Sequence, residues 1–200
     1  MAAVTLYRTI VADPPWRYRS TDILTRGWHA ASVETKKPRS AEGHYTTMTN
    51  EEIAAISVGD LAADDAELYL WVTNPRLYGE RSGGPSPLEI AEAWGFTYKT
   101  LLTWVKTGAP GLGFYFRGCT EHVLYCTRGE IKIAPGRRES NVIIAPRGRH
   151  SEKPDAFYDL VERISPGPRL ELFARRARLS GWDYSGDESL GTAGPIAGIA

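Results

Sequence analysis

The chain has 200 residues, 42% hydrophobic and 24% charged, and its 24 basic and 24 acidic side chains give a formal net charge of zero. This length suits one domain with a full core, and the neutral balance means that nucleic-acid binding would need a local basic patch. The two cysteines have no histidines or cysteines near them at zinc spacing, and no apolar stretch approaches 18 residues. We therefore expect reduced thiols, no metal site, no membrane span or signal peptide, and a cytoplasmic protein.

The first informative feature in chain order is Asp13-Pro14-Pro15-Trp16, which follows the apolar run at residues 6–12. Two prolines in succession fix their own φ angles and hold a short rigid loop at the end of a strand. The loop carries a carboxylate, backbone carbonyls beside residues that lack an N–H group, and a flat aromatic ring. These groups suit a planar amine such as that of adenine, although a strand followed by a Pro-rich turn is the favoured explanation when the motif is taken alone.

Apolar runs of strand length recur at residues 6–12, 68–73, 98–105, 122–127, 142–145 and 170–174, and helical patterns lie at 51–56, 88–94 and 155–164. The first helix opens on a capping-box pair, Thr49 and Glu52, and the other two open at Pro87 and Pro154. Strands that alternate with helices predict an α/β fold with a mostly parallel central sheet flanked by helices. Ligands of such sheets bind beyond the carboxyl ends of the strands, which is where the Asp-Pro-Pro-Trp loop falls.

We predict a single domain over residues 1–188 and a flexible tail over 189–200, which is mostly glycine, alanine and other small residues. Three stretches inside the domain have no regular pattern, at 17–44, 106–118 and 135–149. Irregular stretches of this length in a compact domain are usually functional or disordered. The last stretch carries arginines at 137, 138, 147 and 149, which could contact phosphates without reading a base sequence.

Several single residues admit two interpretations from the sequence alone. Tyr45 either packs on the first helix or lines a site at Trp16. Glu121 heads an apolar strand and therefore needs a partner, whereas its neighbour His122 is more simply read as a satisfied structural group. Lys153 lies just before a helix, where it either neutralises an anion or belongs to a solvated basic loop.

These motifs together resemble the MT-A70 family, the S-adenosylmethionine-dependent adenine-N6 methyltransferases of the Asp-Pro-Pro-Trp type, over residues 7–188. The landmarks stand in the family's order: Asp13-Pro14-Pro15-Trp16, Tyr45-Thr46-Thr47-Met48, Leu70-Trp71-Val72-Thr73, Trp94-Gly95-Phe96, Trp104-Val105-Lys106, Glu121-His122, the segment 150–155, Glu171-Leu172-Phe173-Ala174-Arg175 and Gly181-Trp182. The resemblance implies a class I, Rossmann-like methyltransferase fold and S-adenosyl-L-methionine as cofactor.

The resemblance also implies a role for each matching residue. Asp13 and the Pro14 carbonyl would accept the adenine amino hydrogens, Pro15 would hold the loop, and Trp16 would pack on the base. Lys153 would pair with the cofactor carboxylate. Cofactor contacts are further implied for Asp13, Arg175, Asp187 and Glu188, and substrate contacts for Tyr45, Lys106 and Glu121. Arg147, from the arginine-rich stretch, is predicted to contact the substrate as well.

The predicted function is therefore methyl transfer to an unpaired or flipped adenine of nucleic acid, with DNA favoured over RNA because the compact form is similar to bacterial and phage members. One alternative is a silent nucleic-acid-binding subunit, which the intact Asp13 motif disfavours, or a subunit that depends on a partner, which the motif does not exclude. Another is a protein glutamine-N5 methyltransferase, whose loop begins with Asn instead of Asp. A homodimer or a complex with a partner subunit is compatible with the sequence.

Overall fold

The structure is a computed structural model, which describes residues 5–17, 47–79, 83–111, 115–132, 138–148, 152–174 and 180–186. Four of the predicted site residues, Tyr45, Arg175, Asp187 and Glu188, lie outside these ranges, as does the predicted tail. Among the described residues, no helix is long and apolar enough to cross a membrane.

One sheet of seven strands organises the described part of the chain, in the order β5-β3-β4-β2-β1-β6-β7. The strands are β1 (Tyr7–Ala12), β2 (Ala62–Val72), β3 (Thr97–Thr107), β4 (Thr120–Arg128), β5 (Val142–Pro146), β6 (Arg169–Leu172) and β7 (Trp182–Ser185). Every neighbouring pair is parallel except β2–β4 and β3–β4. Only β4 therefore runs against the other strands, and the predicted mostly parallel α/β fold is confirmed.

Most strand boundaries lie within two residues of the predicted ones, and the larger differences have identifiable causes. Strand β2 begins at Ala62, because the polar stretch before residue 68 also pairs in the sheet. Strand β6 ends at Leu172, because Phe173 has a φ of 61°, in the left-handed region that a strand does not continue through. Strand β7 was not predicted, since four residues are too few for a clear period-two pattern.

Local capping chemistry sets the helix starts. Helix α2 (Asn50–Ala54) opens on the predicted capping box, in which Thr49 and Glu52 bond each other's backbone N–H groups. Helix α3 (Pro87–Ala93) has the same device with Ser86 and Glu89. Helix α4 (Asp155–Ile164) starts after Pro154, and two short 3₁₀ turns, η2 (Val58–Asp60) and η3 (Asn74–Arg76), flank β2.

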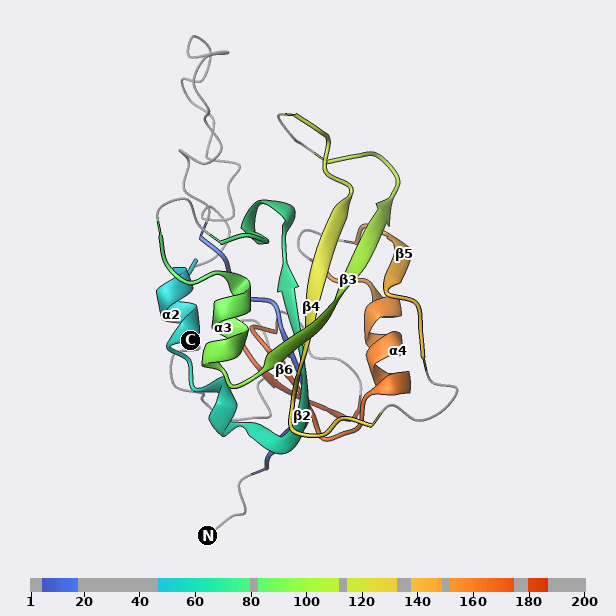
Figure 1. Ribbon diagram of the computed structural model, residues 1–200. Coiled ribbons are helices and arrows are strands. Elements are labelled where there is room, and N and C mark those ends of the chain that lie inside the picture. The colour runs from blue at the N-terminus through green and yellow to red at the C-terminus, as the bar shows by residue number, and fades with distance from the viewer. Residues whose placement is uncertain are drawn as a thin grey trace.

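Helices cover both faces of the sheet, with α2 and α3 on one side and α4 on the other (Figure 1). Alternation along the central strands feeds two cores. Ile10 and Leu70 pack with residues of α2 and α3, whereas Val11, Tyr69 and Trp71 pack with residues of α4. Two buried faces explain why residues 10–12 of β1 and 68–72 of β2 are apolar without interruption.

This topology brings several chain segments to one edge of the sheet. The carboxyl ends of β1, β2, β3 and β5 and the beginning of the antiparallel β4 meet there. The Asp-Pro-Pro-Trp loop follows β1, and the segment that carries Lys153 follows β5. Residues far apart in the sequence are thereby placed to form one site.

Candidate active site

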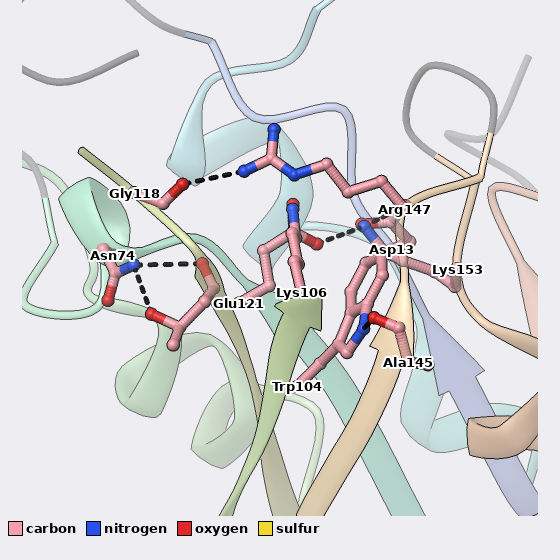
Figure 2. Close-up of polar contacts among 10 residues, drawn as sticks. Asp13, Asn74, Trp104, Lys106, Gly118, Glu121, Ala145, Arg147 and Lys153 are labelled. Atoms are coloured by element: carbon pink, nitrogen blue, oxygen red, sulfur yellow. Dashed lines mark hydrogen bonds and ion pairs between the residues drawn. The ribbon is translucent and has the colours of Figure 1, made fainter. Parts of the chain in front are cut away.

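Four charged side chains form a connected group at this edge, and each was singled out from the sequence. The Lys153 ammonium lies 3.0 Å from Asp13 Oδ2 and 3.0 Å from Glu121 Oε2. The Lys106 ammonium lies 2.5 Å from Glu121 Oε1. Figure 2 shows these side chains converging from the ends of β1, β3 and β4 and from the segment before α4. The group alternates in sign and is neutral as a whole.

The charged side chains of this group are largely buried, so their pairing affects their pKa values. The Lys153 side chain is only 8% exposed, and those of Asp13 and Glu121 are 19% and 16% exposed. Burial by itself would lower the pKa of Lys153, but Asp13 and Glu121 outweigh it and raise that pKa above its ordinary value. Burial likewise favours the neutral form of Glu121, yet Lys153 and Lys106 hold its pKa below the usual value. Lys153 and Glu121 are therefore both held in their charged forms.

Two tryptophans position the ammonium groups. Lys153 Nζ lies 4.8 Å from the centroid of the Trp71 ring, and Lys106 Nζ lies 4.6 Å from that of Trp104. Both distances are within cation–π range. The Trp104 indole N–H donates to the Ala145 carbonyl at 3.0 Å, which fixes the ring across β3 and β5 (Figure 2). Both tryptophans belong to the family landmarks, but no sequence signal indicated that their rings would support the lysines.

A second polar group lies beside the first. Asn74 donates to the Thr120 carbonyl at 3.0 Å and to its hydroxyl at 2.9 Å, and the Asn74 side-chain oxygen lies 2.8 Å from His122 Nε2. The other ring nitrogen of His122 lies 3.1 Å from the Thr103 hydroxyl. Burial lowers the pKa of His122, with Glu121 opposing that shift. His122 is thus a hydrogen-bonded structural group, as the sequence suggested, and Asn74 is a residue that sequence reasoning missed.

The Asp-Pro-Pro-Trp loop is held by its own backbone. The Trp16 N–H donates to the Pro14 carbonyl at 2.8 Å, and the Met48 N–H donates to the Pro15 carbonyl at 2.8 Å. A carbonyl oxygen has two lone pairs, so Pro14 keeps one acceptor position. Rigid placement of Asp13 and of this carbonyl follows from the loop.

The expectation that Trp16 offers a free face to a base needs correction. Its side chain is 3% exposed, and its indole N–H donates to the Trp71 carbonyl at 3.1 Å. The ring belongs to the core on the α2 and α3 side of the sheet. Proline geometry and an aromatic residue type do not specify which way the ring turns, and here burial of its apolar area decides the orientation. Trp16 is a residue that anchors the loop in this structure.

The predicted substrate residue Arg147 lies at the same edge but outside the ion group. Its guanidinium donates to the Gly118 carbonyl at 2.7 Å, at the base of the loop between β3 and β4 (Figure 2). Among the described residues, no group of histidine, cysteine and carboxylate side chains could hold a metal ion.

Comparison with known proteins identifies the family of this chain. The MT-A70 family model matches residues 7–188. The chain is 33% identical over 189 residues to the Type II methyltransferase M.MunI of a Mycoplasma species, which covers 91% of this chain and 77% of that protein.

The chain is also 28% identical over 177 residues to the human N(6)-adenosine-methyltransferase catalytic subunit METTL3, covering 84% of this chain and 26% of that protein. A Drosophila melanogaster MT-A70-like protein is 28% identical over 183 residues, with 88% and 25% covered. The chain thus spans about a quarter of the length of these two animal relatives. It belongs to the MT-A70 family of N6-adenine methyltransferases.

Proposed function

We propose that this enzyme transfers the methyl group of S-adenosyl-L-methionine to the N6 atom of an unpaired or flipped adenine in DNA. The observation that carries the proposal is the buried contact between Asp13 and Lys153 at the carboxyl edge of the sheet. It places an acceptor and a cation side by side, next to a rigid loop with a further carbonyl acceptor.

The residues present fit the proposed cofactor. Its amino-acid end carries one ammonium and one carboxylate, and Asp13 and Lys153 offer the opposite charges 3.0 Å apart. When bound, the cofactor would supply an electrophilic methyl group on a sulfonium. Lys153 would hold the carboxylate while Glu121 continues to balance its charge. Arg175, Asp187 and Glu188 are proposed to contact the ribose and adenine, since they directly follow the described parts of the β6 and β7 segments.

The same loop suits the methyl acceptor. The N6 lone pair of adenine is delocalised into the ring, which makes this nitrogen a poor nucleophile. The Asp13 carboxylate and the Pro14 carbonyl can each accept one amino hydrogen, which favours a pyramidal, more electron-rich nitrogen. Positioning and electrostatics then supply most of the rate, and no covalent enzyme intermediate is needed. Tyr45, Lys106 and Glu121 are proposed to line the base pocket.

The nucleic-acid polymer is inferred from accessibility and from the comparisons. An N6 atom inside a duplex is out of reach, so the target base must be flipped or unpaired. DNA is favoured because the match to the Type II methyltransferase covers 77% of that protein, whereas the adenosine methyltransferases are about four times as long as their match. A homodimer or a partner subunit stays a prediction.

The decisive experiment offers single-stranded DNA, duplex DNA and RNA to the enzyme with S-adenosyl-L-methionine and measures N6-methyladenine by nucleoside mass spectrometry. Asp13→Asn is run alongside, with Asp60→Asn as a matched control, because Asp60 is exposed at the opposite edge of the sheet. Product in DNA that is lost only in Asp13→Asn is the expected result. Product in RNA alone would overturn the assignment of DNA, and equal activity of Asp13→Asn would overturn the role of the loop.

A further inference from the structure

The loop between β3 and β4 carries two neighbouring aromatic side chains that are almost fully exposed. Tyr115 is 86% exposed and Phe116 is 91% exposed. Single exposed apolar residues are ordinary, but two adjacent large rings lose the burial that usually stabilises aromatic side chains. Figure 1 shows the described ends of this loop extending beyond the carboxyl edge of the sheet, the edge that carries the ion group. This position is suited to contact with a substrate.

The base of the loop is an ordered extension of the β3–β4 hairpin. The Lys106 N–H donates to the Cys119 carbonyl at 2.7 Å, and the Gly111 N–H donates to the Gly118 carbonyl at 2.8 Å. Phe116 is three residues from Cys119, so their Cα atoms are separated by at most about 11 Å. That span corresponds to about three base steps of a stacked strand at 3.4 Å per step. The aromatic pair therefore lies within about three base steps of Cys119, whose carbonyl is bonded by Lys106 of the ion group.

Two arginines bind backbone carbonyls where the β3–β4 loop begins and ends, and they bring positive charge there. Arg117 donates to the Pro110 carbonyl at 2.8 Å and to the Gly111 carbonyl at 3.2 Å. Arg147 donates to the Gly118 carbonyl at 2.7 Å. Among the described residues, no carboxylate forms an ion pair with either guanidinium. Within the described ranges both guanidinium groups are therefore uncompensated, and each has more N–H donors than these bonds use, although the chain as a whole is neutral.

Flat aromatic faces beside uncompensated cations are the combination with which proteins hold single-stranded nucleic acid. We propose that Tyr115 and Phe116 form a stacking platform for unpaired bases that flank the target adenine. This inference rests on the nucleic-acid substrate proposed above. Arg117 and Arg147 contact the adjacent phosphates. Tyr115 and Phe116 thereby act as substrate-positioning residues, because they hold the strand from which the target base enters the site.

The test measures the affinity of the cofactor-free enzyme for a fluorescent single-stranded oligodeoxynucleotide with one adenine, by anisotropy at about 50 mM salt. The double variant Tyr115→Ala/Phe116→Ala is compared with Tyr98→Ala. Tyr98 is 42% exposed and lies at the amino end of β3, away from the ion group. Because stacking on one aromatic ring strengthens binding about fivefold or more, we expect at least a fivefold weaker affinity for the double variant and no change for Tyr98→Ala.

Abasic nucleotides then locate the contact. Each position that flanks the adenine is replaced in turn by an abasic residue. At a stacked position, removing the base should weaken binding by the wild type. The same removal should not weaken binding by the double variant, which already lacks the rings. Additive losses at every position would overturn the proposal. Thermal unfolding of each variant confirms that the fold is retained, as expected for side chains this exposed.

The remaining outcomes separate this inference from the proposed function. Wild-type binding that the double variant retains in full would overturn the stacking role while leaving methyl transfer intact. A changed oligomeric state of the double variant in sedimentation, with unchanged oligonucleotide affinity, would assign the pair to a protein contact and overturn the proposal. A wild type that methylates duplex DNA but binds no single strand would overturn it as well.

Discussion

The Lys153 ammonium lies 3.0 Å from the Asp13 carboxylate, in the loop after β1, and 3.0 Å from the Glu121 carboxylate, in β4. Lys153 thereby bridges the two acids. In this arrangement the proposed acceptor for the adenine amine and the proposed anchor for the cofactor carboxylate neutralise each other. Binding of a zwitterionic amino-acid group between them exchanges one set of ion pairs for another without exposing an uncompensated charge. The site is thus preorganised for its proposed ligand.

Asp13→Asn should reduce turnover about 100-fold to 1,000-fold, the effect of losing one preorganised electrostatic contact to the reacting group. The affinity for S-adenosyl-L-methionine should fall less than the turnover does, because Lys153 and its partner Glu121 are kept and the asparagine oxygen can still accept a hydrogen bond from the cofactor ammonium. Calorimetry for the cofactor and single-turnover kinetics for the methyl transfer measure the two quantities. If the losses in affinity and rate were equal, Asp13 would act through the cofactor alone, and its role as an acceptor for the adenine amine would be refuted.

Lys153→Met should weaken cofactor binding more than tenfold, since an ion pair at this position is worth about 1.5–3 kcal/mol. Methionine preserves apolar packing against the Trp71 ring, so a loss of fold is not the expected cause. Calorimetric titration provides the dissociation constant. Lys132→Met is the control, because the Lys132 side chain is 87% exposed and pairs only with Glu130 among the described residues. An unchanged constant for Lys153→Met would refute the assignment.

Glu121→Gln should lower the free energy of unfolding near neutral pH by about 1–3 kcal/mol, because two buried ammonium groups lose their shared carboxylate. The pKa of Glu121 is lower in the folded protein than its ordinary 4.5. Its stabilising contribution is therefore present above that value and is lost as the pH falls through the folded-state pKa.

Denaturant unfolding over an acid pH series checks this dependence. The wild type should lose stability more steeply below about pH 4.5 than Glu121→Gln, which has no carboxyl to titrate at this position. Glu130→Gln removes an exposed carboxylate and controls for the change in net charge. Parallel curves for the wild type and Glu121→Gln would show that Glu121 contributes nothing through its charge.

Trp16→Phe should lower stability by about 1–3 kcal/mol, because the buried Trp71 carbonyl loses the indole donor. Methyl transfer by the folded variant should stay within a few-fold of the wild type, since the ring lies in the core and the backbone bonds of the loop remain. Urea unfolding and initial rates measure the two effects. A large loss of rate at unchanged stability would restore the stacking role that the sequence suggested for Trp16.

Residue order and residue type were sufficient to predict much of this protein. The apolar runs indicated six of the seven strands, and the prolines and capping pairs marked the helix starts, because these signals are local. The ordered landmarks indicated the family, and the isolated acid Glu121 at the head of an apolar strand correctly signalled that it needed a partner.

Only the tertiary structure decided which partners meet. The sheet order places β4 between β3 and β2, so Glu121 lies between Lys106 and Lys153, and Asn74 comes to lie beside His122. The orientation of Trp16 was equally unreadable, because burying the ring against the core competes with leaving it exposed for a base, and the loop sequence is the same in both cases. Long-range pairing and side-chain orientation depend on how all the elements pack together, whereas strand and helix signals depend only on neighbours along the chain.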